Sequence, residues 1–408
     1  MASQNLFAIK AETALVMLSV LFLAACAAHE TSTSGTATGD ERVIVSTFVG
    51  DSRIGFTSSA LGCKGFTGEC GLVDGQGSNA RFYASNGVTI DAAGNLYVTD
   101  AWNFRIRKVT PNGNVTTLAG GGASGKSGGG FADGQGSNAR FRYFESTVID
   151  AAGNLYVADI NNHSIRKVTP NGNVTTLVGP PEGLPSGGGA IGMIAAFALG
   201  KLQLAFPHDI TIDSAGNLYV AVWHGIRKVT PNGNVTTFVG NTGDNLMTAM
   251  DLKGFVDGQG SAAKFDQPRG LVFDRAGNLY VADTHNHRIR KITPGGNVTT
   301  LAGSGPTGKK GDFADGPGNT ARFHWPFDIA IDAAGNLYVA DAHNHRIRKV
   351  TPTGYVTTVA GSQKGFADGN GRVARFTYPN GLAFDRTGNL YVAEGEGNRI
   401  RKIVLPRP

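Results

Sequence analysis

The chain has 408 residues, a formal net charge of +6 and 59 glycines, but only five methionines and three tryptophans. This composition fits an all-β protein with many turns and argues against a helical one. No stretch after residue 25 is long and apolar enough to span a bilayer, because the most apolar one, 187–206, is interrupted by glycines and is interpreted as a loop insertion.

The first 25 residues have the pattern of an export signal. Lys10 precedes an apolar stretch, 13–25, which is too short to cross a bilayer and has the length of a signal-peptide core. The residues Leu23-Ala24-Ala25-Cys26 resemble a bacterial lipobox, which implies cleavage before Cys26 and a diacylglycerol on its sulfur. Ala27 after the cysteine then implies the outer membrane if the host is Gram-negative. The alternative is an ordinary secretory signal followed by a chance cysteine.

Residues 26–42 are small and polar, and they predict a flexible tether between the lipid and a folded domain at 43–408. The other two cysteines, Cys63 and Cys70, lie in CKGFTGEC. In an exported protein we expect a disulfide between them, because two thiolates are too few for a cysteine-only metal site.

The pentapeptide GNLYV occurs six times after this region. The copies are 59, 63, 61, 58 and 53 residues apart, and they begin at Gly94, Gly153, Gly216, Gly277, Gly335 and Gly388. A period of this size is typical of a solenoid or a propeller.

The fourth copy, 271–303, shows what one unit contains. It has four short β-rich runs, separated by Gly-Asn, Asn/His and Pro-Gly-Gly turns, at 271–274, 278–283, 288–293 and 298–303. Helical periodicity is absent. Six such units predict an all-β fold, a six-bladed β-propeller of four-stranded antiparallel blades.

The last copy ends without a fourth strand. The segment VIVSTFVG at 43–50 resembles that missing strand and has no preceding strands of its own. We therefore expect the N-terminal strand to close the last blade, and we expect its removal to damage the whole ring.

The core of the unit, D-x-x-N-x-R-I-R-K-[VI]-T-P-x-G, as at Asp283, Asn286, Arg288 and Lys291, resembles the NHL repeat. The resemblance covers nearly everything after residue 43, and it implies a six-bladed propeller, in agreement with the blade count. It does not fix an activity, because the family includes binding modules, RNA binders, receptor sensor domains and one class of lyase.

Repeated polar residues are expected to serve the ring. Asp283 and Arg288 face each other across a turn and predict an ion pair, with Asn286 capping the backbone. The HNH triplets at 285–287 and 343–345 raise a metal hypothesis, but histidine is what the repeat prefers there, and equivalent turns lie a blade apart.

Two further repeated patterns call for an interpretation. The DGQG-type loops carry one acid each, too few for a calcium loop. These acids are Asp74, Asp133, Asp257, Asp315 and Asp368. We expect a tight turn followed by a short helical turn, in which the arginine of the loop pairs locally, namely Arg81, Arg140, Arg322 and Arg375. The Arg-Lys pairs of the third strands are expected to form an exposed, solvated face.

The informative positions are those that differ between the blades. Innermost strands line the channel of a propeller, and its entrance is the usual ligand site. Five residues before the Asp that follows each inner strand, the copies carry Asn86, Glu145, His208, Arg269, Phe327 and Asn380. Asp209 and Asp328 replace the glycine that follows this position in three other blades. This ring predicts a polar ligand site; the alternative is unselected variation around a water-filled hole.

Two function classes follow. The favoured one is a lipid-anchored, monomeric binding or scaffold module of the cell envelope that presents a propeller face to a protein, peptide or glycan, without cofactor or catalytic residues. The other is a metal-assisted hydrolase or lyase, lactonase-like or amidating-lyase-like, with a divalent cation in the channel. The family's lyases are thought to hold zinc through several axial histidines, whereas only His208 occupies the ring here, with His324 nearby. Export argues against a nucleic-acid partner.

Overall fold

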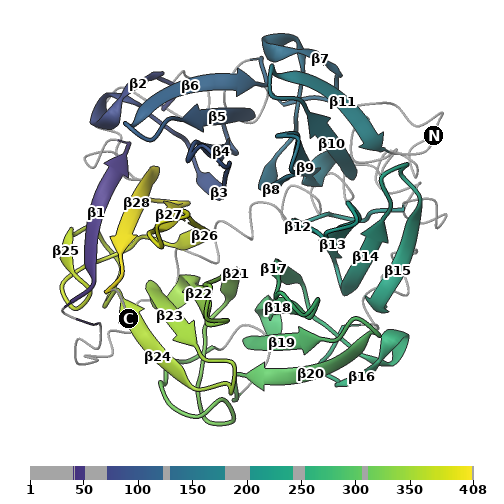
Figure 1. Cartoon of the computed structure of the whole chain (residues 1–408), viewed down its shortest axis with the longest axis vertical. Coiled ribbons are helices and arrows are strands. Elements are labelled where there is room, and N and C mark those ends of the chain that lie inside the picture. Colours follow the sequence, from purple (N-terminus) through teal and green to yellow (C-terminus); the bar gives the residue numbers. More distant parts are fainter. Residues whose placement is uncertain are drawn as a thin grey trace, which may run out of the picture.

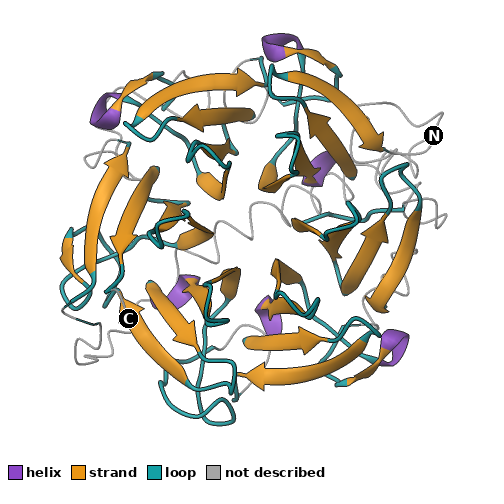
Figure 2. Ribbon diagram, viewed as in Figure 1, coloured by secondary structure: helices purple, strands orange, loops and turns teal. Residues whose placement is uncertain are grey.

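The computed structural model describes residues 40, 42–50, 71–122, 129–179, 203–241, 253–305 and 311–406. They form six antiparallel sheets around a central channel (Figure 1). The only helices among them are three-residue 3₁₀ turns (Figure 2). The predicted six-bladed, all-β propeller is confirmed.

The strands of each blade follow one another from the channel outward. Blade 1 contains β3 (Ser85–Ile90), β4 (Leu96–Asp100), β5 (Arg105–Val109) and β6 (Asn114–Ala119). Blade 2 contains β8 (Phe144–Ile149), β9 (Leu155–Asp159), β10 (Ser164–Val168) and β11 (Asn173–Val178). Blade 3 contains β12 (Asp209–Ile212), β13 (Leu218–Val222), β14 (Gly225–Val229) and β15 (Val235–Gly240).

The other half of the ring repeats this order. Blade 4 contains β17 (Pro268–Phe273), β18 (Leu279–Asp283), β19 (Arg288–Ile292) and β20 (Asn297–Ala302). Blade 5 contains β21 (Pro326–Ile331), β22 (Leu337–Asp341), β23 (Arg346–Val350) and β24 (Val356–Ala360). Blade 6 contains β26 (Pro379–Phe384), β27 (Leu390–Glu394), β28 (Arg399–Val404) and β1 (Ile44–Val49).

Four blades carry a fifth, two-residue strand that the sequence analysis did not predict. These strands come from the DGQG-type loops and pair with the outer strand of their own blade; they are β2 (Gly75–Gln76), β7 (Gly134–Gln135), β16 (Gly258–Gln259) and β25 (Gly369–Asn370). In three blades a 3₁₀ turn follows, namely η2 (Gly77–Asn79), η3 (Gly136–Asn138) and η5 (Gly260–Ala262).

Strand β1 closes the ring as predicted. It pairs antiparallel with β28, from Ile44 opposite Val404 to Val49 opposite Ile400. Blade 6 is therefore built from both ends of the domain, and the outer edge that β28 would otherwise present is covered.

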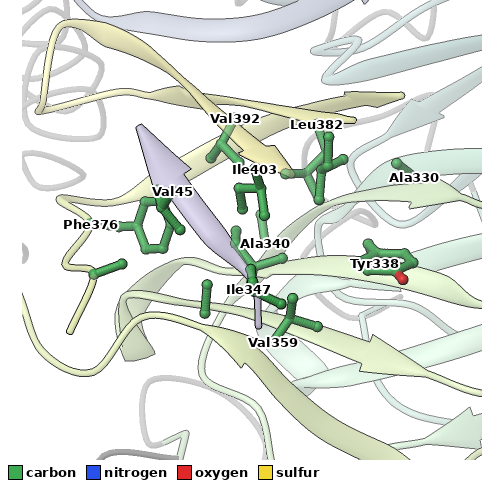
Figure 3. Packing of buried hydrophobic residues seen from close by; sticks show 14 residues of the cluster. Val45, Ala330, Tyr338, Ala340, Ile347, Val359, Phe376, Leu382, Val392 and Ile403 are labelled. Carbon is green, nitrogen blue, oxygen red and sulfur yellow. The ribbon is translucent and has the colours of Figure 1, made fainter. Parts of the chain in front are cut away.

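The apolar residues form six clusters, each between two neighbouring blades. Strand β18 shows why: all five of its residues are buried. Leu279 and Val281 pack toward blade 3, and Tyr280 and Ala282 pack toward blade 5. Successive side chains of a strand point to opposite faces, so a strand buried on both faces has consecutive apolar residues, here Leu279 to Ala282. Figure 3 shows the cluster between blades 5 and 6, to which β1 contributes Val45.

The predicted Asp283–Arg288 ion pair is wrong. The Asp283 carboxylate accepts hydrogen bonds from Arg290 Nη1 at 2.6 Å, Asn286 Nδ2 at 2.9 Å and the backbone N–H of Asp266 at 2.9 Å. Arg288 donates instead to the carbonyl oxygens of Asn286 and Gly305. Both arginines lie on one face of β19, and the fully buried one takes the buried carboxylate.

Arg290 also reaches the DGQG-type loop, where its Nη2 bonds Asp257 Oδ1 at 2.7 Å. The acids of these loops therefore bind the buried arginine of the third strand. The predicted pairing with an arginine of the same loop is wrong for these acids. The same two-acid contact recurs in blades 1, 2, 5 and 6 at Arg107, Arg166, Arg348 and Arg401. The prediction that the third-strand Arg-Lys pairs are exposed is wrong for these arginines, which are 0% exposed.

The second histidine of each HNH triplet connects blades. His287 and His345 adopt the left-handed conformation, with φ of 57° and 54°. Their Nδ1 atoms accept the backbone N–H of Trp325 and Tyr378 in the next blade, at 3.1 and 3.4 Å. These histidines therefore serve the ring, as the repeat pattern predicts.

Candidate functional site

The inner strands enclose a cavity of about 300 Å³ along the channel. One end of it, here called the mouth, is where each inner strand begins; the turns between the second and third strands lie at the same end, because Pro268 pairs with Asp283. The predicted site residues all line this one cavity: Asn86, Glu145, His208, Asp209, Arg269, Phe327, Asp328 and Asn380. Six of these eight residues occupy the same position of the repeat, one per blade, and form what we call the mouth ring: Asn86, Glu145, His208, Arg269, Phe327 and Asn380.

Glu145 is the centre of the polar contacts in the mouth ring. It forms an ion pair with Arg269, which comes from two blades away, and accepts a hydrogen bond from Tyr143 Oη at 3.0 Å. Burial raises the pKa of Glu145, but the positive charge of Arg269 counteracts burial, and the pKa is lowered to about 2. Its carboxylate is therefore ionised at any physiological pH and neutralised by Arg269.

His208 lies beside this pair and is 9% exposed. Its Nδ1 is 3.4 Å from Glu145 Oε2, yet the atoms are not aligned as a hydrogen bond. Neither ring nitrogen has a hydrogen-bond partner in the part of the chain that the structure describes. Burial, and then Arg269, lower the pKa of His208, so the imidazole is neutral and has one donor and one acceptor to offer.

The remaining mouth-ring residues form two further contacts. Asn380 Nδ2 donates to Asn86 Oδ1 at 3.1 Å, which joins blades 6 and 1. The Arg269 guanidinium lies over the ring of Phe327, 4.5 Å from its centroid. The mouth therefore combines amide groups with one aromatic ring that carries a compensated cation.

Asp209 and Asp328 bind the neighbouring blades. Asp209 Oδ2 accepts the backbone N–H of Leu271 at 2.5 Å, and its other oxygen accepts the Ser146 hydroxyl. Asp328 Oδ2 accepts the N–H of Leu382 at 2.7 Å. Burial raises the pKa of Asp209 to about 6; burial and the Asp209 charge raise that of Asp328 well above its usual range. Both carboxyl groups are thus engaged in joining blades 3 to 4 and 5 to 6.

In other blades a glycine stands where blades 3 and 5 have Asp209 and Asp328. There the backbone of one inner strand packs directly against the backbone of the next. A Cβ on Gly270 would lie 2.4 Å from Asp328 Cα, and one on Gly381 would lie 2.5 Å from the Asn86 carbonyl oxygen. Real Cβ atoms do not approach backbone so closely, so these inner strands can be adjacent only without a side chain. Glycine and aspartate at this position are two ways of connecting inner strands.

The structure adds residues that the sequence analysis did not single out. Two positions before each mouth-ring residue, the chain has a non-glycine residue with a φ between 47° and 57°, namely Ala84, Tyr143, Phe206, Gln267, Trp325 and Tyr378. Four of these six are aromatic, and Tyr143 reaches Glu145 directly. The constant offset from the mouth ring is the sequence signal that identifies them once the copies are aligned.

Metal binding was the open question of the enzyme hypothesis. Within the described ranges no group of three His, Cys, Asp or Glu side chains is arranged to hold a metal ion. Asp266 Oδ1 lies 3.8 Å from the Nδ1 atoms of both His224 and His285, close to the mouth. Cys26, Cys63 and Cys70 lie outside the described residues. None of the described helices is long and apolar enough to cross a membrane.

With this geometry in place, sequence comparison identifies the repeat. Residues 265–292, 323–350 and 376–403 match the model of the NHL repeat. The chain carries NHL repeats. Each matched stretch runs from just before the inner strand to the third strand of blades 4, 5 and 6.

Curated relatives are similar to most of this chain, but they are much longer proteins. Protein SUPPRESSOR OF QUENCHING 1, chloroplastic, of Arabidopsis thaliana is 30% identical over 299 residues, 70% of this chain and 27% of that protein. NHL repeat-containing protein 2 of Homo sapiens is 28% identical over 356 residues, 78% of this chain and 46% of that protein. The chain thus spans less than half the length of either relative.

Several solved structures resemble most of this chain in fold. A protein of unknown function from Bacteroides thetaiotaomicron has a TM-score of 0.62 at 19% identity, covering 92% of this chain and 78% of that one. An auxiliary nutrient binding protein from Bacteroides ovatus has a TM-score of 0.61 at 17% identity, covering 90% and 78%. A gluconolactonase from Xanthomonas campestris has a TM-score of 0.51 at 14% identity, covering 92% and 99%. At these identities the likeness shows the fold alone.

Proposed function

We propose that this protein is a lipid-anchored binding module of the bacterial cell envelope, and that its ligand binds at the channel mouth. The observation that carries the proposal is the contrast within the repeat: six side chains of five different types, one from each blade, converge on one cavity. Among them, His208 is buried with both ring nitrogens lacking hydrogen-bond partners in the described residues. Buried polar atoms are normally paired, so a ligand that pairs with them gains affinity.

The path of the chain is compatible with anchoring. Ile44, the first residue of β1, pairs with Val404 at the end of β28, whereas the start of β28 pairs with Glu394 at the mouth end. The tether 26–42 therefore joins the ring at the end away from the mouth. A flexible segment of this length spans roughly 20–25 Å, and a lipid on Cys26 leaves the mouth accessible.

The fold does not decide between a binder and an enzyme, because the names of its structural neighbours include both a nutrient binding protein and a gluconolactonase. The site contacts favour a binder. Glu145 is paired with Arg269, and Asp209 and Asp328 are engaged by backbone N–H groups of neighbouring blades. Three carboxyl groups at the mouth are thereby committed to partners within the protein.

Hydrolysis or lyase chemistry is the second candidate, supported by one observation. His208 is neutral and lies beside the ionised Glu145, an arrangement in which an imidazole acts as a general base. Hydrolysis of simple lactones by the wild type, abolished in His208→Ala, would favour this candidate over a binding module.

Ligand binding is tested by thermal shift on the full chain in detergent, against neutral sugars, dipeptides, amino acids, nucleosides and lactones. We expect one class to raise the Tm of the wild type, and the shift to disappear in Arg269→Ala. Tyr355→Ala is the matched control, because Tyr355 is 50% exposed on a turn at the other end of the blade and outside the cavity. Shifts that are equal in both variants, or absent for every class, would contradict the proposal.

The anchor has a separate test. Radiolabelled palmitate supplied to expressing cells should label the wild type and leave Cys26→Ala unlabelled. Labelling that persists in Cys26→Ala, or a wild type without label, would contradict the lipid anchor and leave the ligand site unaffected.

A further inference from the structure

The mouth has a charge balance that limits its ligands. Its cation, Arg269, is paired with Glu145. Burial keeps His208 neutral, and all four carboxyl oxygens of Asp209 and Asp328 already accept hydrogen bonds from within the protein. A charged ligand entering here would lose its hydration without meeting an unpaired opposite charge, which is costly. An uncharged ligand does not pay this penalty.

The hydrogen-bonding groups of the mouth ring are of a particular kind. The amides of Asn86 and Asn380 and the neutral imidazole of His208 each contain both a donor and an acceptor. A hydroxyl group also donates and accepts, so a ligand carrying several hydroxyls can pair with these groups in either direction. A ligand that only accepts or only donates uses half of them.

Apolar surface adjoins these groups within the same cavity. Phe327 lines the mouth, and Ile90, Ile331 and Phe384 line the channel further in. A sugar ring presents hydroxyls at its edge and C–H groups on its faces, and such faces pack on aromatic rings. The cavity volume of about 300 Å³ is at the lower end of the range for small-ligand sites, and it corresponds to one or two sugar rings.

From this geometry, and resting on the proposed binding function, we infer that the channel mouth binds a neutral monosaccharide or disaccharide. The sugar hydroxyls pair with His208, Asn86 and Asn380, and one apolar face packs on Phe327. The Glu145–Arg269 pair, which lies beside His208, accepts from and donates to further hydroxyls of the sugar. A peptide is the competing class, and its charged termini distinguish it.

Titration calorimetry on the full chain tests this inference with neutral sugars and with charged analogues of glucose and N-acetylglucosamine. The neutral probes are glucose, galactose, N-acetylglucosamine, maltose and chitobiose; the charged analogues are glucuronate and glucosamine. We expect at least one neutral probe to bind, and its charged analogue to bind at least tenfold more weakly. Asn380→Ala should weaken the neutral probe at least tenfold, and Tyr355→Ala should leave it unchanged.

If Asn380→Ala does not fold, Asn380→Asp is used in its place. Aspartate keeps the shape of the asparagine side chain and adds a negative charge, so the same tenfold loss of affinity for the neutral probe is expected. Charged analogues that bind as tightly as neutral probes would overturn the inference. Dipeptides that bind at the mouth while no sugar does would also overturn it, yet leave the binding module standing. If no class binds, the proposed function falls together with the inference.

Discussion

The buried arginine of the third strand and the mouth-ring residue of the inner strand belong to the same repeat, but they differ in how far they vary between blades. The buried arginine has the same two acid contacts in five blades, between 2.5 and 3.1 Å. The mouth ring has five different residue types in six blades. A contact that recurs in almost every blade serves the ring, whereas the mouth residues are free to differ.

Asp209 and Asp328 show that variation alone does not mark a ligand site. They vary like the mouth ring and line the same cavity, but their oxygens accept backbone N–H groups of the next blade. His208 varies and has no such partner in the described residues. Position in the repeat and hydrogen-bond partners together separate structural residues from candidate binding residues.

The largest effect is expected where a single strand holds the ring closed. Val45 on β1 is 1% exposed and packs between blades 5 and 6, while the adjacent Ser46 is exposed. Val45→Asp places an unpaired charge in this cluster and should cost roughly 4 kcal/mol or more. Urea unfolding should show loss of the cooperative transition, or a midpoint far below that of Ser46→Asp. Equal midpoints would mean that β1 does not close the ring.

The next effect concerns the buried arginine and has a matched control within the repeat. Arg290→Ala leaves Asp283 buried without its cation and should cost about 3–5 kcal/mol. Arg227 occupies the equivalent position in blade 3, where Val222 stands in place of the buried Asp283, and there it donates to Thr237 Oγ1 at 2.7 Å among its contacts. Arg227→Ala leaves no buried carboxylate at position 222 unpaired, and it should therefore cost less than Arg290→Ala. Similar losses in the two variants would show that the acid contacts do not stabilise the blade.

A smaller effect is expected at the close approach of inner strands. Gly270→Ala brings a Cβ to 2.4 Å from Asp328 Cα, and relief requires blades 4 and 5 to separate. We expect a loss of about 2 kcal/mol, measured by urea unfolding. Gly295→Ala is the control, since its nearest neighbour is the Thr293 hydroxyl at 4.0 Å. An unchanged midpoint in Gly270→Ala would show that the inner strands are not tightly packed.

Much of the fold could be predicted because six copies of the repeat each predict the same four-stranded blade. Blade number, strand order and closure by 43–50 follow from the copies of GNLYV and from one unmatched strand. The two-residue outer strands could not be predicted, since Gly75–Gln76 has no strand-forming side chains. The partner of Asp283 was missed because Arg288 is opposite in register, and only burial shows that Arg290 takes the carboxylate.

The mouth was predictable in position but not in its contacts. Counting back from the Asp after each inner strand places the eight residues on one cavity, because the copies are in register. Which of them interact depends on the diameter of the ring: Glu145 and Arg269 are 124 residues apart and meet across the channel. The hydrogen bond from the backbone N–H of Leu271 to Asp209 likewise depends on how closely blades 3 and 4 approach each other.

The smallest effect is a pH dependence that separates two carboxyl groups of the same cavity. The pKa of Asp209 is raised from 3.8 to about 6, so its contribution to stability is present below pH 4 and is lost as the pH rises toward and past 6. Asp209→Asn removes this loss, and its stability relative to wild type should rise by on the order of 1 kcal/mol between pH 4 and 7.5, because Asp328 shares the titration.

Glu145→Gln should behave in the opposite way. The pKa of Glu145 is lowered from 4.5 to about 2, so the carboxylate stabilises the fold above pH 4.5, and this contribution is lost as the pH falls toward 2. The variant should therefore be less stable than wild type at pH 7, with the difference shrinking toward pH 2.5. Urea unfolding across this range measures both variants. The stability of each variant relative to wild type should change with pH in opposite directions. A change in the same direction for both variants would contradict a raised pKa for Asp209 and a lowered pKa for Glu145.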